Sequence, residues 1–124
     1  MADVIVGESP GRGRGVFAAR PFREGETIEV CHIIVLPKDD VTKIDGTILY
    51  NYYFGWNASD GSAAIALGCG SLYNHSDTPN AKYHKHIQEA LISIVATAPV
   101  AEGDEILIRY NDPSGGSSVW FDVR

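Results

Sequence analysis

Glycine and proline interrupt this chain so often that it cannot form a long helix. The 124 residues include 13 glycines and 6 prolines, and the apolar runs between them are short. Glycine destabilises the interior of a helix, and proline ends one. The sequence therefore predicts a mainly β fold of short strands joined by turns, with short helical turns at most.

Several stretches have the composition of strands. Residues 27–36, with the sequence TIEVCHIIVL, are mostly β-branched and apolar, which favours an extended conformation. The other predicted strands are a stretch at 63–67, a hairpin of 83–87 and 91–96, and a final strand at 105–110. Helix is predicted only at 41–53, where Gly46 weakens it and favours two short turns.

The composition indicates one acidic domain over residues 1–124. The net charge of −6 opposes nucleic-acid binding, which needs a basic surface, and suits a basic polypeptide partner. The N-terminal sequence MADVIVGESPGR lacks the pattern of a signal peptide, and no apolar run reaches the length of a membrane span. We therefore expect an intracellular protein, cytoplasmic by default or nuclear in a eukaryote, without direct nucleic-acid or membrane contact.

Three features suggest sites but are better explained as ordinary structure. The run Gly11-Arg-Gly-Arg-Gly15 lacks the spacing of a nucleotide phosphate loop and is typical of a tight turn. His84 and His86 would share one strand face and could bind a metal, but no third ligand accompanies them. Cys69, between two glycines, has no adjacent base and resembles a small buried residue more than a nucleophile.

The segment Asn74-His-Ser-Asp-Thr-Pro-Asn80 is more specific in its context. By itself it predicts a turn stabilised by Asn and Asp side chains. It is preceded by Gly13-Arg-Gly-Val-Phe17 and followed by Gly103-Asp-Glu and a strand that ends at Tyr110. This ordered trio resembles the SET-domain protein-lysine methyltransferases over nearly the whole chain.

The resemblance implies an architecture and an activity. It implies short sheets around a C-terminal pseudoknot, with a core over about 4–110 and a closing tail over 111–124. It also implies an enzyme that uses S-adenosylmethionine, yields S-adenosylhomocysteine, and methylates a lysine of a protein, possibly a basic histone-like one. The absence of a Cys-rich segment leads us to expect no metal. The number of subunits and of methyl groups added stays open.

The resemblance also implies the roles of individual residues. Tyr110 matches the tyrosine of the methyl-transfer centre, and Tyr52 matches an aromatic residue of the lysine channel. The aromatic cluster that contains Tyr52 could also simply be core, and this is the interpretation that we favour for Tyr50, Tyr53 and Phe54. The positions expected to bind the cofactor are Arg14, Gly15, Val16, Asn74, His75, Tyr110 and Trp120. Trp120 would stack on the adenine or only anchor the tail.

The chain departs from the family pattern at a few positions. Asp77 stands where a cysteine is frequent, Arg109 replaces an acidic residue, and Asp112 replaces a second aromatic residue. Arg109 and Asp112 lie near the expected lysine entrance, so they bear on substrate preference more than on the cofactor. The alternative function is a catalytically silent SET module that binds a peptide or a protein. A small metal-binding β protein is a third, remote alternative.

Overall fold

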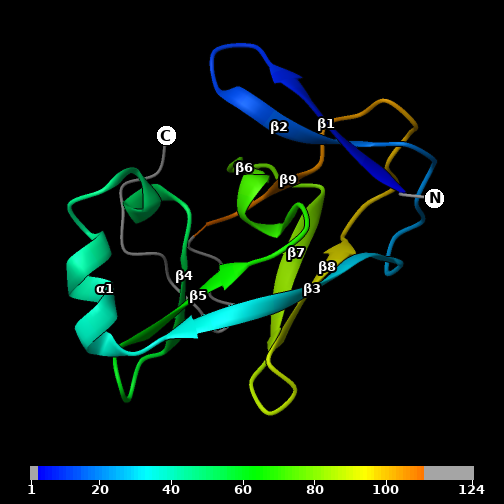
Figure 1. Cartoon of the computed structure of the whole chain (residues 1–124). Coiled ribbons are helices and arrows are strands. Elements are labelled where there is room, and N and C mark those ends of the chain that lie inside the picture. The colour runs from blue at the N-terminus through cyan, green and yellow to red at the C-terminus, as the bar shows by residue number, and fades with distance from the viewer. Residues whose placement is uncertain (1–2, 111–124) are drawn as a thin grey trace.

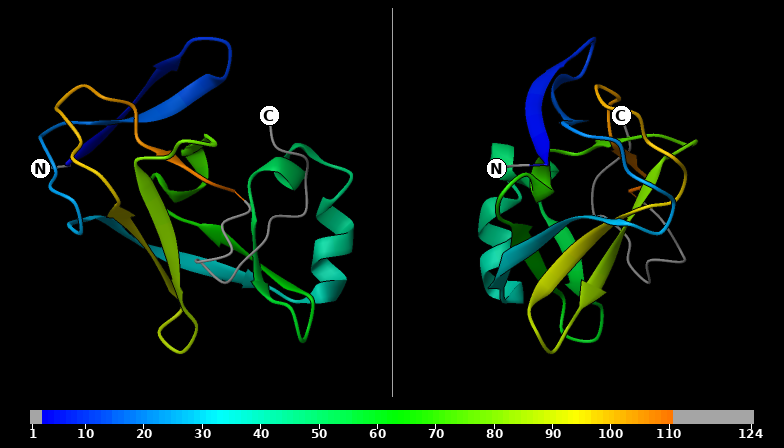
Figure 2. Two further views of the ribbon diagram at one scale, coloured as in Figure 1. Left: turned by 180° about the vertical axis from the view of Figure 1, so that it is seen from behind. Right: turned by 90° about the vertical axis from the view of Figure 1, so that its right-hand side faces the viewer.

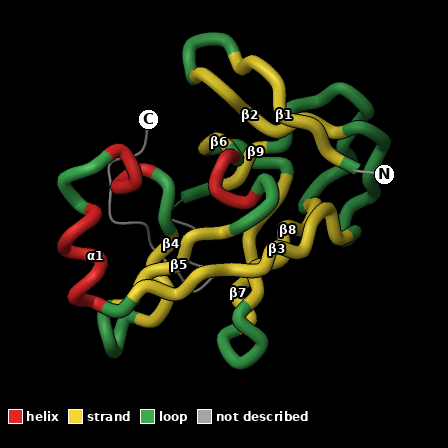
Figure 3. The backbone as a smooth tube through the Cα atoms, viewed as in Figure 1, coloured by secondary structure: helices red, strands yellow, loops and turns green. Residues whose placement is uncertain are grey.

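The longest strand, β3 (Thr27–Leu36), connects the two halves of the main sheet in this computed structural model, which describes residues 3–110. Its first half pairs antiparallel with β8 (Leu91–Ala96), and its second half pairs antiparallel with β5 (Ser62–Ala66). Strands β4 (Phe54–Asn57) and β7 (Ala81–His86) complete a five-stranded sheet of order β4-β5-β3-β8-β7. Figures 1 and 3 show β3 running the length of this sheet.

Two smaller sheets lie beside the main sheet. Strands β1 (Val4–Ser9) and β2 (Gly13–Ala18) form an antiparallel hairpin, whereas β6 (Asn74–His75) and β9 (Leu107–Ile108) pair in parallel. Parallel pairing joins parts of the chain that are far apart in sequence. The hairpin projects from one side of the molecule, with β6 and β9 between it and the main sheet (Figures 1 and 2).

The segment that contains β9 passes between two neighbours. Its beginning pairs with β2, where the N–H of Ile106 donates to the carbonyl of Val16 at 2.8 Å. Two residues later it pairs with β6, and the N–H of Ser76 donates to the carbonyl of Ile108 at 2.9 Å. This crossing is the pseudoknot that the family resemblance implies, and it brings the two ends of the motif trio together.

The helical segments are short, as the sequence predicts. Helix α1 (Lys38–Ile44) begins three residues before the predicted stretch, with Asp39 and Asp40 near its positive N-terminal end. The 3-10 helix η1 (Ile48–Asn51) follows Gly46, so the predicted division at this glycine is confirmed. A second 3-10 helix, η2 (Gly70–Leu72), precedes β6. No described helix is long and apolar enough to cross a membrane.

Two apolar clusters fill the space between the elements. The larger one includes Tyr83 of β7 and Ile92 and Ile94 of β8, whose side chains are completely buried. The smaller one joins Val41 of α1 to Tyr53 and Ala63, and it holds the helix against β5. These clusters fix the framework from which the turns around the pocket extend.

The predicted strands are present, but the structure contains four further strands, and one predicted strand is shorter than expected. Strand β3 has the predicted bounds, and the predicted hairpin is β7 with β8. Strands β1, β2, β4 and β6 were not predicted. Strand β4, for example, is short, and Gly55 interrupts its apolar pattern. The predicted strand at 105–110 is strand only at β9, since its hydrogen bonds are divided between β2 and β6.

Candidate functional site

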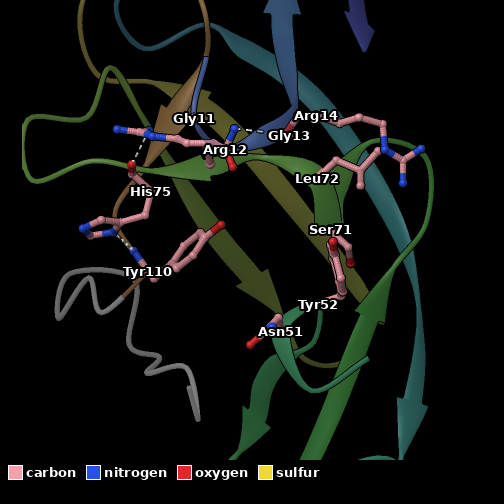
Figure 4. Close-up of a pocket in the computed structure, with 11 residues that line it drawn as sticks. Gly11, Arg12, Gly13, Arg14, Asn51, Tyr52, Ser71, Leu72, His75 and Tyr110 are labelled. Atoms are coloured by element: carbon pink, nitrogen blue, oxygen red, sulfur yellow. Dashed lines mark hydrogen bonds between the residues drawn. The ribbon is translucent and has the colours of Figure 1, made fainter. Parts of the chain in front are cut away.

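A pocket of about 550 Å³ lies where the β1–β2 turn, η1, η2 and β6 converge. Figure 4 shows the residues that line it. They come from five places in the chain, namely residues 11–14, residues 51–52, residues 71–72, residues 74–75 and Tyr110. Its volume falls within the range of ~300–1,000 Å³ that is typical of small-molecule sites. The pocket therefore collects residues from all three motifs, together with others from outside them.

His75 is anchored in the pocket wall by contacts with three other residues. Its side chain is 7% exposed, and its ring Nδ1 accepts a hydrogen bond of 3.0 Å from the backbone N–H of Tyr110. Because Nδ1 accepts, the ring proton resides on Nε2, which lies 3.1 Å from the Asp77 carboxylate. The guanidinium of Arg12 donates to the backbone carbonyl of His75 at 2.8 Å. His75 thus connects the second and third motifs directly and also contacts the residue that precedes the first motif.

Tyr110 is held at both its backbone and its hydroxyl. Its hydroxyl donates a 2.8 Å hydrogen bond to the backbone carbonyl of Tyr73, and its own carbonyl accepts one of 3.0 Å from the hydroxyl of Tyr83. Tyr73 is itself fixed, because its hydroxyl donates to Glu29 at 2.6 Å. Burial, and then this carboxylate, raises the pKa of the Tyr73 hydroxyl, which keeps it a donor. These hydrogen bonds therefore fix the position of the Tyr110 hydroxyl oxygen.

Asn74 lines the pocket, and its side-chain NH2 group donates both of its hydrogen bonds to other protein groups. Its Nδ2 donates to the carbonyl of Arg14 at 3.1 Å and to Oε2 of Glu105 at 2.8 Å. Arg14 also lines the pocket. Gly15 lies behind Asn74 rather than in the lining, and Val16 is fully buried in the larger apolar cluster. Of the three predicted positions in this turn, the structure brings only Arg14 to the pocket wall.

Tyr52 and Tyr110 both border a narrow second cavity of about 10 Å³ that adjoins the pocket. Tyr52 is half-buried at the end of η1, and it lies on the opposite side of the pocket from His75 in Figure 4. The neighbouring aromatic side chains belong to the core, as the sequence predicts. Tyr53 and Phe54 are buried, and Tyr50 packs edge-on against the ring of Tyr53.

One predicted site position and one departure from the family pattern lie outside the described residues, whereas the other two departures can be placed. Trp120 and Asp112 belong to residues 111–124, which the structure does not describe, as does the expected closing tail. Arg109 is exposed immediately before Tyr110. The side chain of Asp77 is 87% exposed and pairs with the ring of His75. Asp77, which departs from the family pattern, thus contacts His75, which matches that pattern.

The two cysteines do not have the environment of a nucleophile. Burial, and then the Glu29 carboxylate, raises the pKa of the Cys31 thiol to about 12 and also raises the pKa of the Cys69 thiol. The backbone N–H of Cys69 donates to Glu29 at 3.0 Å. A raised pKa disfavours the reactive thiolate. Cys69 is half-buried rather than buried, and its raised pKa supports the expectation that it is not a nucleophile.

His84 and His86 do lie on one strand face, with ring centroids 5.0 Å apart. The ring of His86 shares a hydrogen bond of 2.8 Å with the hydroxyl of Ser93. Among residues 3–110, no three His, Cys, Asp or Glu residues are grouped so that they could hold a metal ion. The described part of the chain thus gives this histidine pair no third ligand.

Several pocket residues were not predicted from the sequence. Arg12 lies inside the run Gly11-Arg-Gly-Arg-Gly15, which the sequence indicated to be an ordinary tight turn. Asn51 adjoins Tyr52, and Ser71 precedes the second motif in a turn-rich segment, but neither carries a signal of its own. Glu105 is part of the third motif, and only the structure reveals that its side chain meets Asn74.

The described residues thus combine a β-rich fold and a parallel crossing with a pocket that a tyrosine, a histidine and an asparagine border. The sequence profile of the SET domain matches residues 13–111. The chain belongs to the SET-domain family. The resemblance to the SET-domain protein-lysine methyltransferases that was seen in the sequence is therefore confirmed.

Two of the relatives that it matches are methyltransferases by name. One is the H3 lysine-37 specific histone-lysine N-methyltransferase of Schizosaccharomyces pombe, which is 30% identical over 112 residues, 90% of this chain and 71% of the relative. Another is the N-lysine methyltransferase KMT5A-A of Danio rerio, which is 31% identical over 119 residues, 86% of this chain but only 35% of the relative.

Solved structures of this fold are also similar. A candidate histone methyltransferase of Plasmodium falciparum aligns with a TM-score of 0.73 and 29% identity, over 89% of this chain and 94% of its own. A chain of the Chaetomium thermophilum Polycomb Repressive Complex 2, solved with S-adenosylmethionine, aligns with a TM-score of 0.74 over 90% of this chain and 16% of its own. At 21% identity, the second likeness shows the fold alone.

Proposed function

We propose that this chain transfers a methyl group from S-adenosylmethionine to the side-chain amine of a lysine in a protein. The observation that carries the proposal is the linked pair His75 and Tyr110, joined at 3.0 Å in the wall of one pocket. The family supplies the class of reaction. The arrangement of Tyr110, Asn74 and the two arginines supports the choice of cofactor and the course of the reaction.

The pocket residues fit the chemical groups of S-adenosylmethionine. Arg12 and Arg14 carry positive charge suited to a carboxylate. The amide hydrogens of Asn74 are used within the protein, so this side chain offers its oxygen as an acceptor for an ammonium or hydroxyl group. The pocket volume of about 550 Å³ is large enough for a ligand of this size class. The proposal involves no metal ion.

When bound, S-adenosylmethionine supplies an activated methyl group on a sulfonium centre. The contribution of the protein is to orient the reacting groups in line and to exclude water, which can account for much of a rate enhancement. The hydroxyl hydrogen of Tyr110 points to the carbonyl of Tyr73, so a group that approaches the hydroxyl meets its oxygen. That oxygen can accept a hydrogen bond from the lysine amine and so direct the nitrogen lone pair.

The lysine must lose a proton before it can react. With a pKa of ~10.4 for a free side chain, deprotonation at pH 7 costs about 4.6 kcal/mol. An aromatic surrounding and a nearby positive charge both lower the pKa of an amine. The narrow cavity between Tyr52 and Tyr110, bordered also by Tyr53, Phe54 and Tyr73, provides the aromatic surrounding. We place the amine at the mouth of this cavity and assign no carboxylate as its base.

A basic, histone-like substrate is the class that we favour. The chain has a net charge of −6, which attracts a positively charged polypeptide at long range. The relative from Schizosaccharomyces pombe is named for a histone lysine. Both points concern the class of substrate and leave the individual lysine to experiment.

Methylation of a protein by the purified chain tests this function. The protein is incubated with methyl-labelled S-adenosylmethionine and either core histones or a cell lysate, and labelled bands are analysed by mass spectrometry. We expect label on lysine, retained in the presence of a chelator and reduced at least about tenfold in Tyr110→Phe. Binding of S-adenosylmethionine without label in any protein would instead favour a catalytically silent module.

A further inference from the structure

Glu105 connects two pocket-forming segments through its two carboxylate oxygens. Oε1 accepts a hydrogen bond of 2.8 Å from the hydroxyl of Ser9, and Oε2 accepts one of 2.8 Å from Nδ2 of Asn74. Ser9 is only 3% exposed, so its hydroxyl depends on this partner. A carboxylate with two protein donors is restricted to one orientation.

The backbone of Glu105 is equally well fixed. It forms an isolated antiparallel bridge with Phe17 of β2. On its other side, the carbonyl of Glu105 accepts a hydrogen bond of 3.0 Å from Nδ2 of Asn80, whose Oδ1 accepts one of 2.8 Å from the N–H of Leu107. Glu105 therefore sits at the centre of the crossing, between the strand of the first motif and the end of the second.

The neighbouring Gly15 leaves the space that this carboxylate needs. A β-carbon on Gly15 would lie 2.3 Å from Oε2 of Glu105 and 2.9 Å from Nδ2 of Asn74, closer than real β-carbons approach. The φ angle of Gly15 is not in the left-handed region, so its backbone conformation does not require glycine. We conclude that the second glycine of the first motif makes room for the Glu105–Asn74 contact.

We propose that Glu105 is a positioning residue, which orients the Asn74 amide so that its oxygen faces the ammonium group of the bound cofactor. The inference rests on the proposed function, and it deepens that function by naming what sets the selectivity of the pocket. Both Nδ2 hydrogens of Asn74 are used, one by Glu105 and one by the carbonyl of Arg14. The carbonyl of Arg14, the carboxylate of Glu105 and Oδ1 of Asn74 make this corner of the pocket rich in acceptors, which suits a positively charged donor.

Without the carboxylate, the amide of Asn74 loses the shorter of its two contacts and keeps only the carbonyl of Arg14, at 3.1 Å, to distinguish its two ends. A half-turn about the last side-chain bond exchanges oxygen and nitrogen with little change of shape. The nitrogen would then present hydrogens to the ammonium group, and no hydrogen bond could form between them. Loss of Glu105 should consequently affect recognition of the ammonium group more than recognition of the rest of the ligand.

A comparison of two ligands isolates this effect. S-adenosylhomocysteine and its analogue without the amino group are titrated calorimetrically into the parent, Glu105→Ala, Glu105→Gln and the control Glu102→Gln. Glu102 is an exposed carboxylate close in sequence, so its variant has a matched loss of charge. Glu105→Leu, which fills more of the space without an acceptor, replaces Glu105→Ala if the alanine variant does not fold.

We expect the parent and Glu102→Gln to bind the analogue roughly tenfold to a hundredfold more weakly than S-adenosylhomocysteine, as for a hydrogen bond to a charged group. In Glu105→Ala, the preference for S-adenosylhomocysteine over the analogue should fall to about threefold or less. Glu105→Gln should keep most of this preference, because glutamine can accept a hydrogen bond from Asn74 and donate one to Ser9.

Two failures can be told apart. A parent protein that binds neither ligand contradicts the proposed function and this inference with it. A parent that prefers S-adenosylhomocysteine, together with a folded Glu105→Ala that prefers it equally strongly, contradicts the role of Glu105 alone. Equal weakening of both ligands by Glu105→Ala also contradicts it, because that result is what a purely structural role would give.

Discussion

The backbone N–H of Tyr110 donates a hydrogen bond of 3.0 Å to the Nδ1 atom of His75, across a sequence separation of 35 residues. The ring centroids of the two residues are 5.2 Å apart. A backbone donor does not depend on the rotamer of its own side chain, so it holds the histidine ring at a fixed place beside the tyrosine. This contact positions the second motif relative to the end of the third.

The first prediction concerns the tautomer of His75. Because Nδ1 accepts from Tyr110 and Nε2 faces the Asp77 carboxylate at 3.1 Å, the neutral ring should carry its proton on Nε2. Nitrogen-15 NMR of the imidazole in the ligand-free protein distinguishes the two tautomers. A ring protonated on Nδ1 would show that the contact with Tyr110 does not exist in solution.

The second prediction concerns the hydroxyl of Tyr110. Tyr110→Phe keeps the ring and removes the hydrogen bond to the carbonyl of Tyr73. Loss of one aimed polar contact at a reaction centre typically costs on the order of 10²–10³ in rate. We expect cofactor affinity near that of the parent and turnover at least about tenfold lower at every pH.

In the parent, turnover should rise from pH 7 toward pH 9 as the substrate amine deprotonates. Steady-state kinetics across this pH range would measure the turnover of the variant and the pH dependence of the parent. Near-parental turnover in Tyr110→Phe would contradict the role of Tyr110 and make Tyr52 the next residue to test.

The third prediction tests the space at Gly15. Gly15→Ala places a β-carbon against Glu105 and Asn74, so it should lower the free energy of unfolding by about 1–3 kcal/mol, the usual cost of overpacking. Gly46→Ala is the matched control, because nothing lies within 4 Å of its added β-carbon and its φ angle is not left-handed. It should change stability by less than about 0.5 kcal/mol. Denaturant unfolding of both variants gives the comparison, and equal stabilities would refute the close approach.

The fourth prediction concerns the cysteines and pH. The pKa of Cys31 is raised to about 12 and that of Cys69 is raised as well, so both thiols stay protonated near pH 8. Because the thiolate is the reactive form, Cys69 should react more slowly than free cysteine, and its rate should rise with pH. Cys31, which is 2% exposed, should react only after unfolding. Fast labelling of both thiols at neutral pH, measured with a disulfide reagent, would contradict this picture.

The sequence predicted the elements whose signals are local. The β-branched run that forms β3, the hairpin of β7 and β8, and the division of the helical stretch at Gly46 all follow from residue types within a few positions. The ordered motifs likewise indicated Asn74, His75 and Tyr110. These predictions needed no knowledge of how distant segments meet.

The rest depends on contacts between distant segments. The strand predicted at 105–110 is divided because its hydrogen bonds go to two neighbours, and the partner of Glu105 lies 31 residues away at Asn74. Val16 follows a glycine of the first motif but faces the core, because side chains alternate along β2. Which face of a strand borders a pocket is set by packing, and a single sequence does not specify it.

Binding of S-adenosylmethionine to the parent and to Asn74→Ala, measured by isothermal titration calorimetry, tests the central claim most directly. Asn74 lines the pocket with its amide hydrogens used inward, so its oxygen is available to the ligand. The account predicts one site in the parent and an affinity weaker by about 1–3 kcal/mol in a folded Asn74→Ala, the cost of a lost buried polar partner. A parent protein that gives no binding heat and no thermal stabilisation with S-adenosylmethionine, or an Asn74→Ala variant that binds as tightly as the parent, would contradict it.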